Sequence, residues 1–513
     1  MRYVIGIDLG TSGTKTVLFD EGGNVIASST VEYPMYQPQN GYAEQDPADW
    51  YNAAVSTIKT VIGKSGVNND HIAGIGLSGQ MHGLVMLDEN CEVIRRSIIW
   101  CDQRTEKEVE EMNAKIGREK LMKITANPAL TGWTAAKILW VKNNEPENYA
   151  KCKHILLPKD YIRFKLTGEF ATEVSDASGM QLLDVPNRCW SEEICSLLGI
   201  DMSMLAKVYE SCEVTGHITE KAAEATGLKA GTPVAGGAGD NAAAAVGTGV
   251  VEDGKAFTTI GTSGVVFAHT SKVSIDPEGR VHTCCAAVPG EWHIMGVTQA
   301  AGLSLRWYRD NFCREEMSAA ALMNKDAYEL MTAEAETVPI GSDRLLYLPY
   351  LMGERTPHLD PNARGMFFGL SAVHTKKHML RAVMEGVSYS LRDCVEICRE
   401  MNINVSDMAA CGGGGTSPLW RQMLADLYNC PVKTMASKEG PALGAAILAM
   451  VCAGIYPDVK TACAAVVKTD KQQQPCAENV PEYNKYYEFY RKIYPSVKPL
   501  CAELSKLEVR DKK

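Results

Sequence analysis

Val4–Asp20 reads VIGIDLGTSGTKTVLFD, and in the second half of the chain Phe257–Phe267 reads FTTIGTSGVVF. In both segments an extended apolar run leads into Gly-Thr-Ser-Gly and a second extended run follows, which predicts a strand–turn–strand unit. A tight turn of this composition exposes backbone N–H groups and small hydroxyls that can bind an anion. One such turn is usually only a hairpin, but two in the same context predict a pair of turns that clamp a polyphosphate.

The first turn also resembles a P-loop, because Lys15 and Thr16 follow its glycines. A P-loop needs glycine directly before the lysine, where this chain has Thr14, and it must open a helix. The residues after Lys15 instead continue as a strand to Phe19 and turn at residues 21–24. The sequence therefore predicts a β-hairpin here and excludes a P-loop.

Composition limits the partners. The 513 residues are 45% hydrophobic and 22% charged, with a net charge of −10, which is typical of a globular protein with sizeable cores in two large domains or three smaller ones. No run of Lys or Arg stands out. We therefore expect no nucleic acid and no membrane among the partners, and positive charge only where an anionic substrate binds.

The 17 cysteines are spread through apolar segments and none forms a Cys-x-x-Cys pair. The chain starts directly with a strand pattern, without an apolar export segment, and no later run is long enough to span a bilayer. We interpret the cysteines as reduced, mostly buried thiols and expect a cytoplasmic protein.

Two aspartates stand next to glycine-rich turns. Asp8 ends the first strand, beside the turn that is predicted to hold phosphates, and its carboxylate suits a Mg²⁺ ion bound to those phosphates; a turn-capping role is the alternative. Asp240 follows Gly236–Gly239 at the start of an Ala-rich helix. It is either the N-cap of that helix or a general base that accepts the proton of an attacking hydroxyl, and the residues alone favour neither role.

Two further segments offer binding groups. Gln80, Met81 and His82 follow a small-residue strand and present amide, thioether and imidazole groups that suit a polyol, although a lone histidine in an apolar stretch is more often structural. Gly412–Gly415 lies between a strand and a helix, where bare backbone can support a nucleotide ring or ribose. A tetraglycine by itself is more often a flexible turn.

The order of the elements predicts an α/β fold of two related domains that face a central catalytic cleft, each with one phosphate turn. The predicted domains are 1–247, with the sugar site, the first turn and the catalytic aspartate; 248–455, with the second turn and the nucleotide platform; and a C-terminal helical tail, 456–513. In the tail, tyrosines between Tyr483 and Tyr494 recur at helical spacing, which predicts core packing.

These motifs resemble the FGGY family of carbohydrate kinases, within the actin-like (ribonuclease H-like) ATPases, over nearly the whole chain. The segments GWTAAKILWV at 132–141 and GMFFGL at 365–370, the latter followed by AVME at 382–385, are similar to the two family signatures. GQMHG at 79–83, WCDQR at 100–104, LPKD at 157–160 and GERTPH at 353–358 are most similar to members that phosphorylate D-xylulose.

The resemblance implies ATP and Mg²⁺ as cofactors and a role for each matching residue. Asp240 would be the catalytic base and Asp8 the second catalytic residue and metal ligand. The sugar would contact Gln80, Met81, His82, Asp240 and Asn241. The nucleotide would contact Thr11, Ser12, Lys15, Gly261, Thr262, Gly302, Gly413 and Gly414. Relatives often have other residues at the positions of Arg306 and Pro418.

We therefore expect ATP-dependent phosphorylation of D-xylulose to D-xylulose 5-phosphate, with Asp240 acting on the 5-hydroxyl. Another pentulose or a polyol, such as ribulose or glycerol, is the alternative within the same chemistry. A nucleotide-driven binding or chaperone module is the alternative from another class, but it gives no use to the Asp240 turn or to residues 79–83. Family members often form homodimers, and no segment here identifies an interface.

Overall fold

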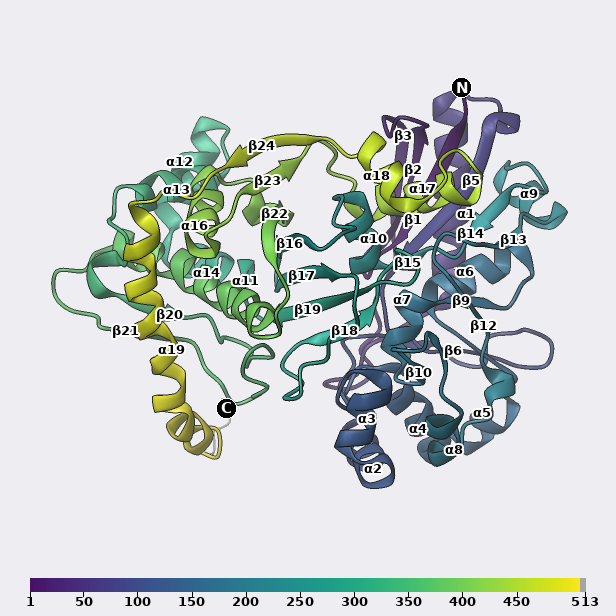
Figure 1. The fold of residues 1–513 in the computed structure, drawn as a ribbon, viewed down its shortest axis with the longest axis horizontal. Coiled ribbons are helices and arrows are strands. Elements are labelled where there is room, and N and C mark those ends of the chain that lie inside the picture. Colours follow the sequence, from purple (N-terminus) through teal and green to yellow (C-terminus); the bar gives the residue numbers. More distant parts are fainter. Residues whose placement is uncertain (508–513) are drawn as a thin grey trace. The chain divides into compact units, whose positions relative to one another are not determined.

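The computed structural model describes residues 1–507, which form two compact units. Unit 1 comprises residues 1–252, 269–293 and 437–468, and unit 2 comprises residues 253–268, 294–436 and 469–513. Both are mixed α/β structures (Figure 1). Neither unit is contiguous in the sequence, and this differs from the predicted ranges 248–455 and 456–513.

The sheet of unit 1 is built on the first Gly-Thr-Ser-Gly hairpin. Its strands run in the order β13-β14-β5-β1-β2-β3, with β15 also paired to β5. β2 is antiparallel to β1 and to β3, whereas β5 is parallel to β1, β14 and β15. The bounds are β1 (Tyr3–Leu9), β2 (Gly13–Asp20), β3 (Val25–Glu32), β5 (Ile72–Gly79), β13 (Val214–His217), β14 (Pro233–Ala235) and β15 (Ala238–Gly239). The predicted hairpin is therefore present.

Helices cover both faces of this sheet. On one face lies α1 (Pro47–Ser65), whose start is fixed by local residues: the Asp46 side chain accepts a hydrogen bond from Ala48 N and Pro47 occupies the first turn. On the other face α17 (Gly440–Cys452) packs against β1, β5 and α10 (Asp240–Gly247). A Cβ at Gly444 would lie 1.8 Å from the Ala243 carbonyl oxygen, so only glycine allows this approach of the two helices.

This packing explains why residues 437–468 belong to unit 1. α17 and the following α18 (Val459–Val466) bury apolar side chains in one core with Val4, Val17 and Phe19. Helix–sheet contact of small residues across more than 400 positions has no local signature, so the sequence pattern placed this segment with the second half of the chain.

The rest of unit 1 is a helical region inserted after β5. Much of its core is a separate buried cluster that includes Leu84, Leu139 and Leu198, whereas Ile162, Leu166 and Ala222 join the core between the sheet and α1. Its elements are β6 (Val85–Leu87), α2 (Glu106–Ile116), α3 (Arg118–Thr125), α4 (Thr134–Asn144), α5 (Pro146–Lys151), β8 (His154–Leu156), α6 (Pro158–Thr167), β9 (Ala171–Glu173), α7 (Val174–Ala177), a 3-10 turn η2 (Ser178–Met180), α8 (Glu192–Leu198), β12 (Lys207–Tyr209) and α9 (Glu220–Thr226).

Unit 2 repeats the plan of the first sheet. Its strands run β19-β17-β16-β22-β23-β24, with β17 antiparallel to β16, β22 parallel to β16 and to β23, and β24 antiparallel to β23. The bounds are β16 (Gly254–Ile260), β17 (Gly264–Thr270), β19 (Trp292–Thr298), β22 (Val405–Cys411), β23 (Val432–Met435) and β24 (Thr469–Gln473). The two hairpins thus lie in equivalent places, which confirms the predicted duplication. The polar Gln-rich segment forms β24, an edge strand that the sequence pattern did not predict.

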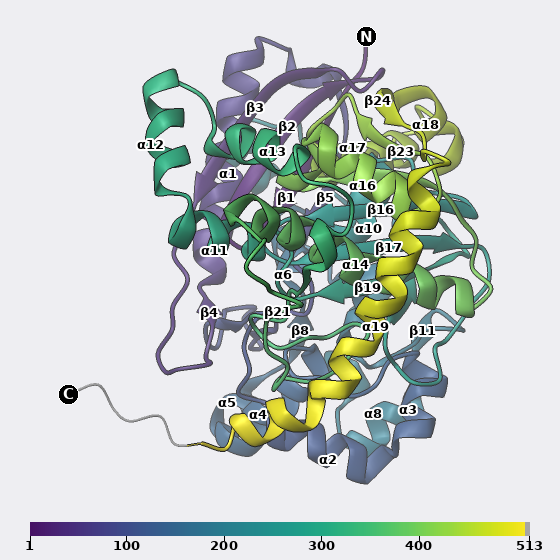
Figure 2. The ribbon, with the colours of Figure 1, turned by 90° about the vertical axis from the view of Figure 1, so that its left-hand side faces the viewer.

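Helices pack on this second sheet around the long α14 (Lys376–Glu400). The other helices are α11 (Gly302–Phe312), α12 (Arg314–Met323), α13 (Ala327–Glu336), α15 (Gly412–Gly415), α16 (Pro418–Tyr428) and α19 (Asn479–Leu504). Figure 2 shows α19 in yellow; it packs on α14 and α16 and buries Tyr483, Tyr487, Tyr490 and Tyr494, as predicted. The predicted tail extends to residues 508–513, which lie outside the described residues.

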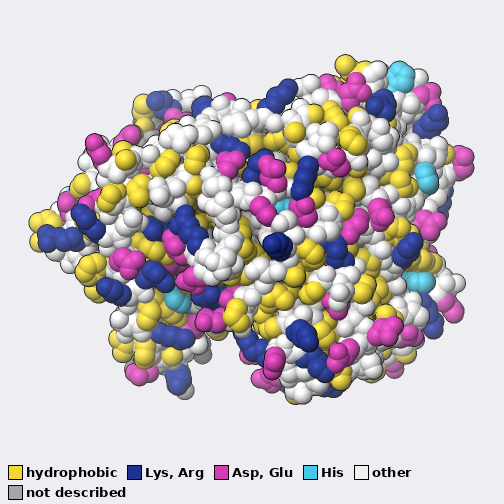
Figure 3. All heavy atoms as spheres, viewed as in Figure 1, with side chains coloured by type: hydrophobic (Ala, Val, Ile, Leu, Met, Phe, Trp, Pro, Cys, Tyr) yellow, Lys and Arg dark blue, Asp and Glu magenta, His cyan; other side chains and the backbone are white. Residues whose placement is uncertain are grey.

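On the face drawn in Figure 3, basic and acidic side chains are interspersed rather than gathered in a patch of one sign. Within residues 1–507 no helix is long and apolar enough to cross a membrane. The cysteines of this region are all free thiols.

Candidate functional site

Three neighbouring parallel strand ends bring Asp8 and Asp240 together in unit 1. Asp8 on β1 lies beside Ser78 on β5, and Ser78 lies beside Ala238 on β15, two residues before Asp240. Because neighbouring strands are about 4.8 Å apart, Asp8 and Ala238 lie about 10 Å apart at the backbone, and Asp240 follows two residues later at the same edge of the sheet. This is the arrangement that a shared catalytic site requires.

Asp240 is the first residue of α10, and the N-cap of this helix is Gly239. The structure therefore does not support the alternative role of Asp240 as the N-cap. Its Oδ1 accepts hydrogen bonds from Asn241 N at 2.7 Å and from Asn241 Nδ2 at 2.9 Å. Burial, together with the nearby negative charge of Asp8, raises the pKa of Asp240 to about 6. A carboxylate with this pKa is ionised at neutral pH and is a stronger base than an ordinary aspartate, as general-base catalysis requires.

Among the described residues, Asp8 accepts a hydrogen bond from one side chain. Ser78 Oγ donates to Asp8 Oδ1 at 3.0 Å. Burial raises the pKa of Asp8, which Ser78 and the Lys15 ammonium partly oppose. The negative charges of Asp8 and Asp240 repel each other, so it is costly to ionise both groups. Their carboxylate oxygens suit a hard divalent cation that would arrive bound to the phosphates. Residues 1–507 contain no group of three or more His, Cys, Asp or Glu side chains arranged for a metal ion, so phosphate and water would supply the remaining ligands.

The predicted sugar-binding residues directly follow β5. Met81 lies against Gly239: a Cβ built there would come within 2.9 Å of Met81 Cγ. His82 has φ of 67° and its Nδ1 is 2.9 Å from the Gly179 carbonyl oxygen. Gln80 is buried and donates through Nε2 to Gln45 Oε1 at 2.8 Å, so its amide supports the loop from inside. Met81 therefore lies against the residue that precedes Asp240, His82 lies against Gly179, and Gln80 is directed into the interior.

Two residues of this site carried no role in the sequence analysis. The Trp133 ring stacks on His82 with ring centroids 4.5 Å apart, and the buried Lys137 donates from Nζ to the His82 carbonyl oxygen at 2.7 Å. Burial lowers the pKa of Lys137 to about 7. Both residues belong to the 132–141 segment, so its Trp-x-x-x-Lys spacing was the available signal: it places the two side chains one helical turn apart.

The first Gly-Thr-Ser-Gly turn lies between β1 and β2, next to Asp8. Trp100 Nε1 donates to Thr11 Oγ1 at 2.9 Å, and Ser12 is the exposed tip of the turn. The Lys15 ammonium forms an ion pair with Glu439, the residue that precedes α17. Lys15 would therefore have to exchange this partner to bind a phosphate. Trp100 is 45% exposed, which is unusual for a tryptophan and was not predicted.

The second turn opens into a pocket of about 850 Å³ that lies wholly within unit 2. All five predicted nucleotide-binding residues of this unit line it: Gly261, Thr262, Gly302, Gly413 and Gly414. Gly413 and Gly414 lie in the single helical turn α15, and a Cβ at Gly413 would meet no atom within 4 Å. The tetraglycine is thus an ordered wall of a cavity rather than a flexible turn.

The opposite wall of the pocket comes from the segment around α13, with Asp326, Tyr328, Glu329, Thr332 and Glu336. This wall was not predicted, since nothing in the sequence of an ordinary polar helix indicates which cavity the helix faces. Arg306 and Pro418 also line the pocket. The volume is within the range of cavities that hold a ligand of nucleotide size.

Comparison with known proteins assigns the family. Residues 3–247 match the N-terminal domain, and residues 256–453 the C-terminal domain, of the FGGY family of carbohydrate kinases. The chain belongs to this family. The resemblance inferred from the sequence motifs is thereby confirmed, and this FGGY kinase is an ATP-dependent sugar kinase.

The FGGY kinase is 39% identical to the xylulose kinase of Bacillus subtilis over 504 residues, which are 98% of this chain and 99% of that protein. It is also 33% identical to the gluconokinase of Bacillus subtilis, over 94% of this chain and 93% of that protein. Among solved structures, the xylulose kinase from Rhodospirillum rubrum superposes with a TM-score of 0.91 at 29% identity and covers 98% of this chain and 100% of that one. The predicted class, two actin-like α/β ATPase domains, is confirmed by this match.

Proposed function

We propose that this FGGY kinase phosphorylates the 5-hydroxyl of D-xylulose with ATP. Relatives named xylulose kinases match nearly the full length of the chain, and these names supply the substrate. The observation that carries the chemistry is the basic carboxylate of Asp240, which lies beside Asp8 and next to the Met81–His82 loop. This arrangement combines a proton acceptor with polar groups for a sugar.

In the proposed reaction Asp240 accepts the proton of the 5-hydroxyl as its oxygen attacks the γ-phosphorus of ATP. The bond between the γ-phosphorus and the β,γ-bridging oxygen breaks, and ADP leaves. His82 and Asn241 orient the sugar so that a single hydroxyl lies against Asp240 Oδ2, since Oδ1 is occupied by the Asn241 donors. General-base assistance of this kind contributes about 10²–10⁴ in rate.

Nucleotide binding is assigned to both Gly-Thr-Ser-Gly turns. The pocket of unit 2 takes the base and ribose, with Gly302, Gly413 and Gly414 in its wall and Gly261 and Thr262 toward the phosphates. Thr11, Ser12 and Lys15 are the corresponding phosphate-binding candidates of unit 1.

Asp8 is the candidate ligand of Mg²⁺, because it is a half-buried acid beside a phosphate turn and, within residues 1–507, Ser78 is its one side-chain hydrogen-bond donor. When bound, Mg²⁺ neutralises charge on the β- and γ-phosphates. The same ion would also lower the cost of holding Asp8 and Asp240 ionised next to each other.

A coupled assay of ADP release tests the substrate. We expect D-xylulose to give the highest kcat/KM in a panel that also contains D-ribulose, glycerol and D-gluconate. Gluconate is included because of the 33% identity to a gluconokinase. A higher kcat/KM for another compound would replace D-xylulose as the substrate, and sugar-independent ATP turnover would favour the binding-module alternative.

The Asp240→Asn variant tests the base. We expect the variant to fold and to lose at least about 10³ in kcat, in line with the removal of a general base. Near-normal turnover in a folded Asp240→Asn protein would rule out the role. Dependence of turnover on Mg²⁺, abolished in Asp8→Asn, tests the metal.

Two further predictions concern the protein as a whole. A homodimer, expected from the family resemblance, is tested by analytical ultracentrifugation of the full chain. A cytoplasmic location is tested by cell fractionation.

A further inference from the structure

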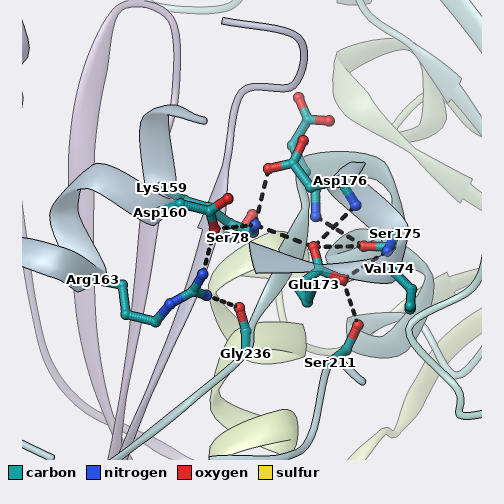
Figure 4. Close-up of polar contacts among 12 residues, drawn as sticks. Ser78, Lys159, Asp160, Arg163, Glu173, Val174, Ser175, Asp176, Ser211 and Gly236 are labelled. Carbon is teal, nitrogen blue, oxygen red and sulfur yellow. Dashed lines mark hydrogen bonds and ion pairs between the residues drawn. The ribbon is translucent and has the colours of Figure 1, made fainter. Parts of the chain in front are cut away.

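Unit 1 contains a fully buried cluster of five charged side chains, Lys159, Asp160, Arg163, Glu173 and Asp176 (Figure 4). Lys159 Nζ is 2.8 Å from Asp160, 3.1 Å from Glu173 and 3.0 Å from Asp176. Arg163 Nη2 donates to Asp160 Oδ1 at 2.6 Å. The reaction described above uses none of these residues. A buried cluster of this size is costly unless its charges are balanced and hydrogen-bonded.

The charges in the cluster do balance. Burial raises the pKa of Asp176 to about 8, with the neighbouring acids Asp160 and Glu173 adding to the rise and Lys159 opposing it. Asp176 is therefore mostly protonated at pH 7, which leaves two cations against two anions. The cluster is fully buried and Lys159 contacts three of its carboxylates, so it can serve as a rigid support.

Glu173 is the best-connected member. Its carboxylate accepts hydrogen bonds from Ser175 N at 2.8 Å, Asp176 N at 3.0 Å, Ser175 Oγ at 3.1 Å and Ser211 Oγ at 2.8 Å. With Lys159 as the ionic partner, these donors hold both carboxylate oxygens (Figure 4). Because Ser175 Oγ donates its proton to Glu173, its lone pairs are free to accept a hydrogen bond from another group.

Ser175 connects this support to the catalytic peptide. Its Oγ accepts a hydrogen bond from Gly239 N at 3.2 Å, and Gly239 immediately precedes Asp240. Four residues further along the same segment, the Gly179 carbonyl oxygen lies 2.9 Å from His82 Nδ1. Residues 173–179 therefore contact both the Gly239–Asp240 segment and the Met81–His82 loop, which is proposed to bind the sugar.

We propose that Glu173 and Ser175 are positioning residues, which hold the Asp240 peptide in register with the Met81–His82 loop. The inference rests on the proposed role of Asp240 as the base. Its physical basis is geometric: a proton acceptor works only within hydrogen-bond distance of the hydroxyl, and a misplacement of about 1 Å costs up to about 10² in rate. Without the Ser175 acceptor, the first turn of α10 is free to shift away from Met81.

The test is Ser175→Ala, with Ser178→Ala as its matched control. Ser178 is a buried serine three residues away, and its Oγ donates to Val174 O and accepts from Cys285 N without touching Gly239. We expect Ser175→Ala to lower kcat by about tenfold. KM for the sugar should change by less than about threefold, because the Met81–His82 loop keeps its contact with the Gly179 carbonyl oxygen. Ser178→Ala should keep the wild-type kcat.

A pH profile separates positioning from simple stability. In Ser175→Ala, water that reaches Asp240 should lower its pKa toward the ordinary value, so the acid limb of the kcat/KM profile moves to lower pH. If Ser175→Ala only destabilised the protein, the acid limb of its kcat/KM profile would stay at the wild-type pH. Equal kcat values and equal acid limbs for the Ser175 and Ser178 variants would overturn the inference. If Ser175→Ala does not fold, the near-isosteric Ser175→Cys, with its weaker acceptor, is measured by the same criteria.

Combination with Asp240→Asn distinguishes the two proposals. If Asp240 is the base and Ser175 acts through it, Asp240→Asn abolishes turnover and Ser175→Ala adds no further loss in the double variant. If Asp240→Asn is active, the proposed function fails together with this inference. If Asp240→Asn is inactive while Ser175→Ala matches the wild type, only the positioning role fails.

Discussion

Replacing Asp240 with asparagine should stabilise unit 1 while it removes turnover. The pKa of Asp240 rises from 3.8 to about 6, first because of burial and second because of the charge of Asp8. A rise of about two units corresponds to roughly 3 kcal/mol of unfavourable free energy for the ionised form. Because one part of Asp240 is open to solvent, which screens the charge, we expect a gain of about 1–2 kcal/mol at neutral pH. Asparagine keeps the Oδ1 acceptor that binds Asn241.

The gain should depend on pH with a definite sign. A carboxyl group whose pKa is raised by folding favours the folded state fully only below its unfolded pKa, and this contribution is lost as the pH rises through the folded pKa. The difference in the free energy of unfolding between Asp240→Asn and the wild type should therefore grow from about pH 4 to about pH 7 and then level off. Urea denaturation of both proteins between about pH 5 and about pH 8, followed by circular dichroism, measures it.

Asp20→Asn is the control with the opposite sign. Burial raises the pKa of Asp20, but hydrogen bonds from Asn24 and Gly22 outweigh it and lower the pKa overall. This variant should lose stability at neutral pH and regain wild-type stability in acid. A folded Asp240→Asn protein that is no more stable than the wild type at pH 8, or a difference that shrinks as the pH rises, would refute the account of Asp240 as a destabilised, basic carboxylate.

Three further predictions follow from close contacts. A Cβ at Gly444 would lie 1.8 Å from a backbone oxygen of α10, so Gly444→Ala should cost about 2–3 kcal/mol in urea denaturation, whereas Gly440→Ala, with no atom within 4 Å, should be neutral or stabilising. Lys137→Met removes one of the two side-chain donors to the His82 carbonyl oxygen and leaves that of Thr134, so it should raise KM for the sugar by about tenfold without lowering the melting temperature. Gly413→Ala adds a methyl to the open wall of the unit 2 pocket and should raise KM for ATP at unchanged stability, whereas Gly414→Ala, whose Cβ would lie 2.5 Å from a side chain of β16, should lower the melting temperature.

Much of the fold was predictable because its decisive signals are local. The two hairpins follow from paired extended runs around the same turn, and the start of α1 follows from Asp46 and Pro47. The glycines of unit 2 that are proposed to bind the nucleotide each lie at a strand–helix or strand–strand junction, and the structure brings them to one pocket.

The unpredicted features depend on contacts between distant residues. α17 belongs to unit 1 because Gly444 and Gly247 permit close helix packing, and no periodic pattern encodes such a partner. Lys159 is fully buried although its neighbours in the sequence suggest an ordinary charged helix; only the three carboxylates that surround it make this possible. The acidic wall of the pocket at α13 likewise depends on tertiary packing alone.

The two copies of the hairpin have diverged in a way that accounts for their separate tasks. Asp8 faces Ser78 across β1 and β5, whereas the equivalent pair in unit 2 is Thr259 and Cys411 across β16 and β22. In the proposed reaction, the acid at the first hairpin would hold one divalent cation, and the neutral second hairpin would offer its backbone N–H groups to phosphate. The duplication thus supplies a common frame, and the proposal assigns the metal-binding acid to the first copy alone.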